Sequence, residues 1–164
     1  SGDTVRCKLP APKPGGSALS TTVSGSVAAR SDAGNLDLAL LVARILLVVI
    51  FPISAYYKII GWPGIVGMLT QQGAPLPMLG GYIAIAVEIL GALLVVIGLW
   101  TRWAALVLIL YVAGTSIIAH RFWEFAPPAQ FGQRMQFFKN LCMIGGLLLV
   151  AVIGPGRYAV QPRP

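Results

Sequence analysis

The sequence GGYIAIAVEILGALLVVIG, residues 80 to 98, decides the fold, because it is long enough to cross a bilayer and carries one carboxylate near its middle. An ionisable side chain at that depth is costly unless it faces a partner or a wet cavity, so Glu88 is expected to mark a site. Spacings of four and three place one set of residues on a single helix face: Ala84, Glu88, Gly91, Val95 and Gly98. Apart from Glu88, the residues on this face have small side chains, which predicts close packing against another membrane helix.

The composition is that of a membrane protein. Of 164 residues, 57% are hydrophobic and 10% are charged, whereas charged residues make up about 25% of a soluble domain. The net charge of +7 does not indicate nucleic acid as a partner, because Lys and Arg gather in the tails and at the ends of the apolar runs. The lipid bilayer is therefore the expected partner.

Four apolar runs, each about as long as a membrane span, cover residues 36 to 60, 78 to 98, 103 to 120 and 135 to 153. The sequence thus predicts an all-α integral membrane four-helix bundle over residues 36 to 160, between an N-terminal tail (1 to 35) and a short C-terminal tail (161 to 164). Pro52 is expected to kink the first helix.

The N-terminal tail is rich in Ser, Gly, Pro and Ala and has no apolar run that would make it a signal peptide. It is not expected to order alone. We expect it to bind another membrane subunit in extended form, with the helix faces providing further contacts.

The segments between the apolar runs also carry structural signals. Residues 62 to 73 carry Pro near a helix start and Gly at a helix stop, which indicates a short interfacial helix. Residues 121 to 136 are expected to form an aromatic and proline-rich loop, and the two segments together to roof the same end of the bundle. Lys and Arg are more frequent on the side of the tails, which predicts that both termini are cytoplasmic.

The polar residues inside the spans are the candidate site. Arg44 and Glu88 should differ in height by about 6 Å, so a buried ion pair between them is predicted. Such a pair would either lock the helix register or take part in ligand or proton handling. Lys58, His120, Lys139 and Asn140 are predicted to reach similar depths and to form a basic pocket under the roof.

Each of these residues has a simpler interpretation. Lys58 would serve as an interfacial anchor, His120 as a helix cap and Asn140 as a helix-to-helix hydrogen bond. Glu88 and His120 are the candidate catalytic residues, His120 because histidine titrates near neutral pH. The sequence has no metal-ligand spacing, no phosphate loop and no nucleophile with a base nearby, so no metal and no intrinsic cofactor are expected.

The order of several motifs resembles the DoxX family of small bacterial membrane proteins. The motifs are RILL around Arg44, QGAPLP before the second span, EILGALLVVIGLWTR from Glu88, AHRFW after the third span, QFFKNLCMIGG in the fourth and GPGRY at its end. The likeness covers residues 38 to 160. The six polar positions, at 44, 58, 88, 120, 139 and 140, correspond to recurring polar positions of the family. One departure is the sequence SAYY at 54 to 57, where relatives often have a glycine.

The resemblance implies a bacterial inner-membrane protein, some of whose relatives are subunits of thiosulfate:quinone oxidoreductases. Two functions follow as expectations. In the first, the protein is the membrane subunit of a redox or electron-transfer complex and contributes a pocket for a quinone or a small acid. In the second, it is an accessory subunit that anchors or stabilises a larger complex. Because the chain has no redox motif of its own, it would not be catalytic alone.

Overall fold

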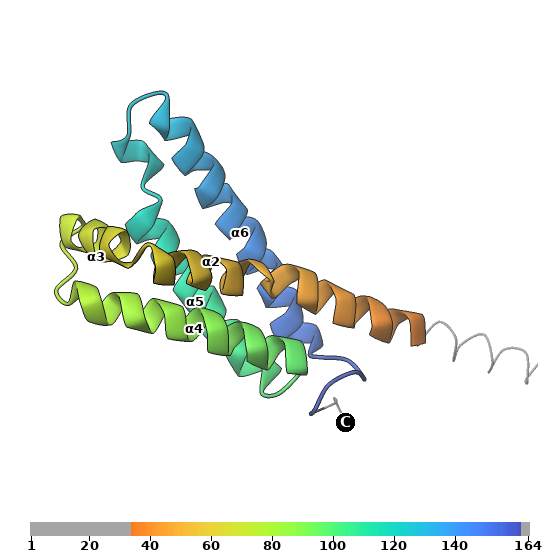
Figure 1. Cartoon of the computed structure of the whole chain (residues 1–164). Coiled ribbons are helices and arrows are strands. Elements are labelled where there is room, and N and C mark those ends of the chain that lie inside the picture. The colour runs from red at the N-terminus through yellow and green to blue at the C-terminus, as the bar shows by residue number, and fades with distance from the viewer. Residues whose placement is uncertain (1–33, 162–164) are drawn as a thin grey trace, which may run out of the picture. The chain divides into compact units, whose positions relative to one another are not determined.

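The computed structural model describes residues 34–161, which form helices joined by short loops (Figure 1). The chain divides into two units, Ser1–Asn35 and Leu36–Pro164, and the fold described below is that of the second. Within residues 34–161, four helices are long and apolar enough to cross a membrane: Gly34–Ile60, Pro77–Ile97, Thr101–Glu124 and Ala129–Ile153. The predicted class, an all-α protein with four membrane-spanning helices, is confirmed.

The first span is interrupted once. A helix over residues 34–48 ends at a turn at Val49, and α2 (Ile50–Ile60) continues in nearly the same direction (Figure 1). Pro52 explains the interruption, because proline has no N–H to donate to the carbonyl of Val48, four residues earlier. The effect of Pro52 is thus a break in the helix one turn before the proline, with little change of direction, and not the predicted kink.

α3 (Trp62–Gln71) follows directly and confirms the short helix expected from the loop sequence. It packs against the start of α4 (Pro77–Ile97), where the rings of Trp62 and Tyr82 lie 4.5 Å apart. Gly81 makes this approach feasible, since a Cβ atom there would lie 2.9 Å from the indole of Trp62. α3 thus covers one end of α4, as half of the predicted roof.

The other half of the roof is shorter than predicted. After α5 (Thr101–Ala119) comes the 3-10 helix η1 (Phe122–Glu124), and α6 (Ala129–Ile153) begins six residues before the predicted start at 135. The prediction of a loop through residue 136 was therefore wrong. Phe122 packs edge-on against Phe137, so η1 lies against α6.

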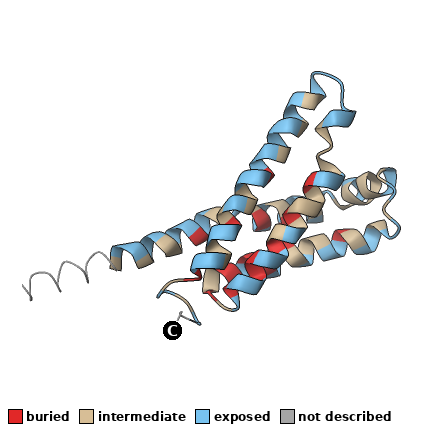
Figure 2. Ribbon diagram, turned by 180° about the vertical axis from the view of Figure 1, so that it is seen from behind, coloured by how far each residue is buried: buried red, intermediate tan, exposed pale blue. Residues whose placement is uncertain are grey.

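The core lies where all the spans meet, toward the end of the bundle that carries the C-terminal segment (Figure 2). It contains apolar side chains from each span: Val48, Phe51, Val95, Leu108, Val112 and Leu147. Toward the opposite end, α6 diverges from α2 and α3 (Figures 1 and 2). In the 18-residue apolar stretch of α6, only 11% of the residues are buried within the chain. The remaining apolar surface is suited to lipid.

Residues 154–161, which we call the C-terminal strap, cross the end of the bundle. The N–H groups of Val160 and Gln161 bond to the carbonyls of Ile97 and Gly98, at 2.9 and 3.2 Å. These carbonyls lie at the C-terminal end of α4, where no further turn of helix can satisfy them. The strap also reaches the first span, because the N–H of Arg157 donates to Asp37 at 3.1 Å. It therefore ties the first span to the α4–α5 turn.

Candidate functional site

Glu88 is the centre of a buried hydrogen-bonded cluster on α2, α4 and α5. Its Oε1 atom accepts three hydrogen bonds, from Lys58 Nζ at 2.6 Å, Tyr111 Oη at 2.8 Å and Ser54 Oγ at 3.0 Å. Lys58 also donates to Ser54 Oγ. The side chain of Glu88 is 4% exposed and that of Lys58 is 17% exposed. We call Ser54, Lys58, Glu88 and Tyr111 the Glu88 cluster.

The cluster keeps unused hydrogen-bonding capacity. The second carboxylate oxygen, Oε2, is buried and has no partner among the described residues. An ammonium group has three protons, and two of those on Lys58 are used by Glu88 and Ser54. The unpaired acceptor lies in the interior, where an unmade hydrogen bond is costly, and the remaining Lys58 proton belongs to a side chain that is 17% exposed.

The predicted ion pair between Arg44 and Glu88 is wrong. Glu88 pairs with Lys58, and Arg44 Nη1 donates to the carbonyl of Val95 at 3.2 Å. Val95 lies seven residues beyond Glu88 on α4, which is about 10 Å along the helix. Counted from the outer ends of the two apolar runs, Arg44 lies 16 residues from Ile60 and Val95 lies 17 residues from Met78, so Arg44 is level with Val95 and not with Glu88.

Arg44 instead closes the end of the bundle. It is 1% exposed, and its second terminal nitrogen donates to the carbonyl of Tyr158 in the strap. A cation at the C-terminal end of α4 also interacts favourably with the helix dipole. Gly98 belongs to the same packing, since a Cβ atom there would lie 2.9 Å from Arg44 Nη1. Arg44 is therefore a structural tie between the first span, α4 and the strap.

The other three predicted pocket residues have separate neighbours. Asn140 on α6 is buried and donates to Ser116 Oγ at 3.0 Å, which is the helix-to-helix hydrogen bond of the simpler interpretation. His120 Nδ1 lies 2.9 Å from Gln133 Oε1. Lys139 is exposed on α6. Within residues 34–161 no hydrogen bond or ion pair joins Lys58 to any of these three, so their grouping into one pocket stays a prediction.

Two members of the Glu88 cluster were not predicted. Ser54 lies one helical turn before Lys58, so the spacing of four was a usable signal. It also lies at the start of the SAYY departure from the family pattern, where it supplies a hydroxyl group. Tyr111 stands in the middle of an apolar span, and a phenolic hydroxyl at that depth needs a partner, which was a second usable signal. Among the described residues there is no group of three side chains suited to hold a metal ion.

The comparisons with known proteins agree with the architecture. The DoxX family model matches residues 39–121. The chain is 39% identical to the inner membrane protein YphA of Escherichia coli over 76% of this chain and 89% of that protein. It is 34% identical to the inner membrane protein YqjF of Escherichia coli over 76% of this chain and 91% of that protein. A Surfeit locus protein 4 homolog of Schizosaccharomyces pombe is 29% identical over 59% of this chain and 32% of its own length. No solved structure matches the chain.

Proposed function

Because the chain belongs to the DoxX family of membrane proteins, we propose that it is an inner-membrane subunit of a redox complex and binds a quinone head group at the Glu88 cluster. The inner membrane is proposed because YphA and YqjF are inner membrane proteins. The cytoplasmic placement of both termini is part of the same proposal and rests on the distribution of Lys and Arg.

The observation that carries the proposal is the pair of unused groups in the cluster. Glu88 Oε2 is buried without a partner, and Lys58 retains one proton that is not engaged. A quinol hydroxyl donates a hydrogen bond and a quinone carbonyl accepts one. The cluster therefore offers a complementary group to each of the two forms, in an apolar bundle that suits the ring.

Charge favours a quinone over a small acid. The ammonium of Lys58 and the carboxylate of Glu88 already balance each other at 2.6 Å. An anionic ligand would add an uncompensated negative charge to this interior, and such a charge is expensive to bury. A neutral ring that exchanges hydrogen bonds carries no such cost.

Electron transfer requires a partner in this proposal. The sequence contains two cysteines, at 7 and 142, and no redox motif, so the electrons would come from another subunit. The role of this chain is then to hold the quinone and to donate or accept hydrogen bonds as its oxygens change protonation state.

The test is the quinone content of the protein purified from its native membrane in mild detergent. Glu88→Gln and Lys58→Met should each weaken quinone binding by at least about tenfold, the loss expected for one hydrogen bond to a charged group. His120→Ala and Lys139→Ala are the matched controls, since within residues 34–161 neither residue is hydrogen-bonded or ion-paired to the cluster, and both should retain quinone.

Two outcomes would contradict the proposed quinone site. Loss of quinone in His120→Ala and Lys139→Ala, with retention in Glu88→Gln, would place the pocket at the outer residues and overturn the proposed site. Wild-type protein that carries no quinone but copurifies with a partner in a fixed ratio would support the accessory-subunit function instead.

A further inference from the structure

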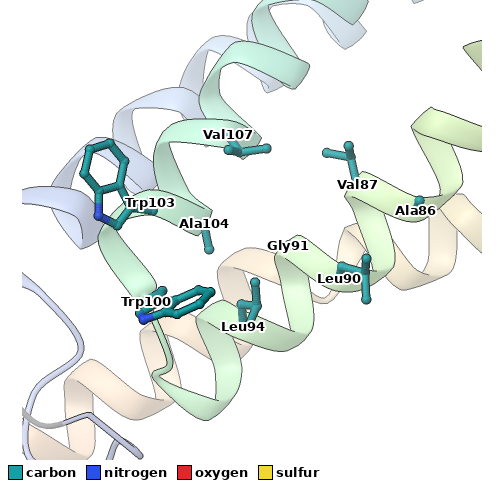
Figure 3. Close-up of a pocket in the computed structure, with 9 residues that line it drawn as sticks. All are labelled: Ala86, Val87, Leu90, Gly91, Leu94, Trp100, Trp103, Ala104 and Val107. Carbon is teal, nitrogen blue, oxygen red and sulfur yellow. The ribbon is translucent and has the colours of Figure 1, made fainter.

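An apolar groove runs along the outer surface of the bundle between α4 and α5 (Figure 3). Its volume is about 290 Å³. Val87, Leu90 and Leu94 form its α4 wall, and Trp103 and Val107 belong to its α5 wall. Leu90, Trp103 and Val107 are exposed, so the groove opens toward the bilayer. We call it the α4–α5 groove, and it is distinct from the Glu88 cluster.

Small residues create the groove. Ala86, Gly91 and Ala104 line it, and none of them has a side chain large enough to fill the space between the helices. Gly91 also sets the helix separation, because a Cβ atom there would lie 2.7 Å from Leu108 Cδ2. The close approach at Gly91 and the groove beside it thus have the same cause.

The length of the groove fits one leaflet. Along α4 it extends from Ala86 to Leu94, which is about 12 Å, close to half of the hydrocarbon thickness of about 30 Å. One end is marked by Trp100 and Trp103, and tryptophan is enriched at the membrane–water interface. The groove therefore runs from that interface toward the middle of the bilayer, as an acyl chain does.

Trp100 is held in place at the interfacial end. Its backbone has φ +47°, a left-handed conformation that is unfavourable for a large side chain. The strap maintains this conformation, because Gln161 Oε1 accepts a hydrogen bond from the Trp100 N–H at 3.1 Å. The result is an indole ring placed across the end of the groove (Figure 3). Strain maintained by a tertiary contact suggests that the position of this ring has a function.

The charge at this end is positive. Arg102, between the two tryptophans, and Arg157 in the strap are both exposed. The one acidic residue of the described chain at this end is Asp37, which already accepts the N–H of Arg157. The first turn of α5 adds the partial positive charge of a helix N-terminus. A phosphate group beside the groove would therefore meet favourable charge.

We propose that the α4–α5 groove binds an acyl chain of an anionic phospholipid, whose phosphate lies at the Trp100 end near Arg102. The chain fills the space beside Gly91, and Trp100 and Trp103 flank the glycerol region. The lipid is a tightly held structural ligand, and the site is independent of the quinone site proposed above.

The experiment is native mass spectrometry of the full chain in mild detergent, after addition of phosphatidylglycerol or of phosphatidylethanolamine with the same acyl chains. Wild-type protein should retain phosphatidylglycerol preferentially. Val107→Trp and Ala86→Leu fill the groove from opposite helices and should each abolish this retention. Leu110→Trp is the matched control, because Leu110 is 73% exposed on α5 outside the groove, and it should retain the lipid. Arg102→Gln should weaken phosphatidylglycerol retention by about fivefold, as expected for one surface cation.

Thermal unfolding of each variant identifies those that remain folded. Equal retention of the two lipids by wild-type protein, or unchanged phosphatidylglycerol retention in folded Val107→Trp and Ala86→Leu, would overturn the proposal. Equal loss in Leu110→Trp would show that the lipid binds the general apolar surface and would overturn it as well.

Discussion

Lys58 on α2 and Glu88 on α4 form an ion pair of 2.6 Å within the membrane-spanning part of the bundle. Ser54 and Tyr111 bond to the same carboxylate oxygen, so three of the helical segments meet at one atom. A pair of this kind contributes little net stability when compared with a well-packed apolar pair, but the loss of one partner leaves an uncompensated charge. The pair therefore joins α2 to α4 at one level of the bundle.

The first prediction concerns this pair. Glu88→Gln or Lys58→Met alone should each lower the free energy of unfolding by about 3 kcal/mol, the low end for a broken buried pair, because Lys58 is partly exposed. The double variant should lose much less than the sum of the two. Thermal unfolding in detergent measures the cycle. Additive losses would show that the two charges do not interact.

The second prediction concerns Arg44. Arg44→Lys should lower stability by about 1 to 3 kcal/mol, because an ammonium group cannot reproduce the fork that reaches the carbonyls of both Val95 and Tyr158. Limited proteolysis should then cut the C-terminal strap more rapidly. The losses in Arg44→Lys and Glu88→Gln should add, since these residues share no contact. If Arg44→Lys and Glu88→Gln were instead coupled as strongly as the changes at Lys58 and Glu88, Arg44 and Glu88 would interact as predicted from the sequence.

The third prediction compares two glycines in membrane helices. Gly91→Ala places a methyl group against the fully buried Leu108, so it should destabilise the bundle by about 1 to 2 kcal/mol. Gly114→Ala meets nothing within 4 Å and should stabilise it by about 0.5 to 1 kcal/mol through the lower entropy of the unfolded chain. Unfolding midpoints of the two variants test the difference. The same sign of change in both would contradict the packing at Gly91.

The fourth prediction concerns the N-terminal tail, which up to residue 33 lies outside the described residues. Deletion of residues 1 to 33 should leave the unfolding midpoint of the bundle unchanged. It should weaken retention of the chain in its native complex, since a Pro- and Gly-rich segment can bind a large surface in extended form. Copurification of the truncated chain with its partners measures this. Full retention would show that the tail is not a binding segment.

Several parts of the site could be predicted from the sequence. Glu88, Lys58 and Asn140 were identified as interior polar residues, and all three make hydrogen bonds to other helices. The cost of a polar group in an apolar span is a local property, and it is visible without knowledge of the neighbours. The hydroxyl groups of Ser54 and Tyr111 were overlooked because neutral side chains give a weaker signal than charges do.

The number and approximate limits of the spans were determined by the sequence alone, because the length and apolar character of a run suffice to make a membrane helix. Only the tertiary structure decided which cation meets Glu88. Arg44 and Lys58 lie on the same seam of the first span, fourteen residues apart, and the prediction from the sequence chose Arg44. The choice depends on the height of α2 relative to α4. At the observed height, Trp62 packs on Gly81 at one end of the bundle. At the other end, Arg44 bonds to Val95 and to the strap. These contacts join residues far apart in the chain, so no periodicity within a single helix contains them.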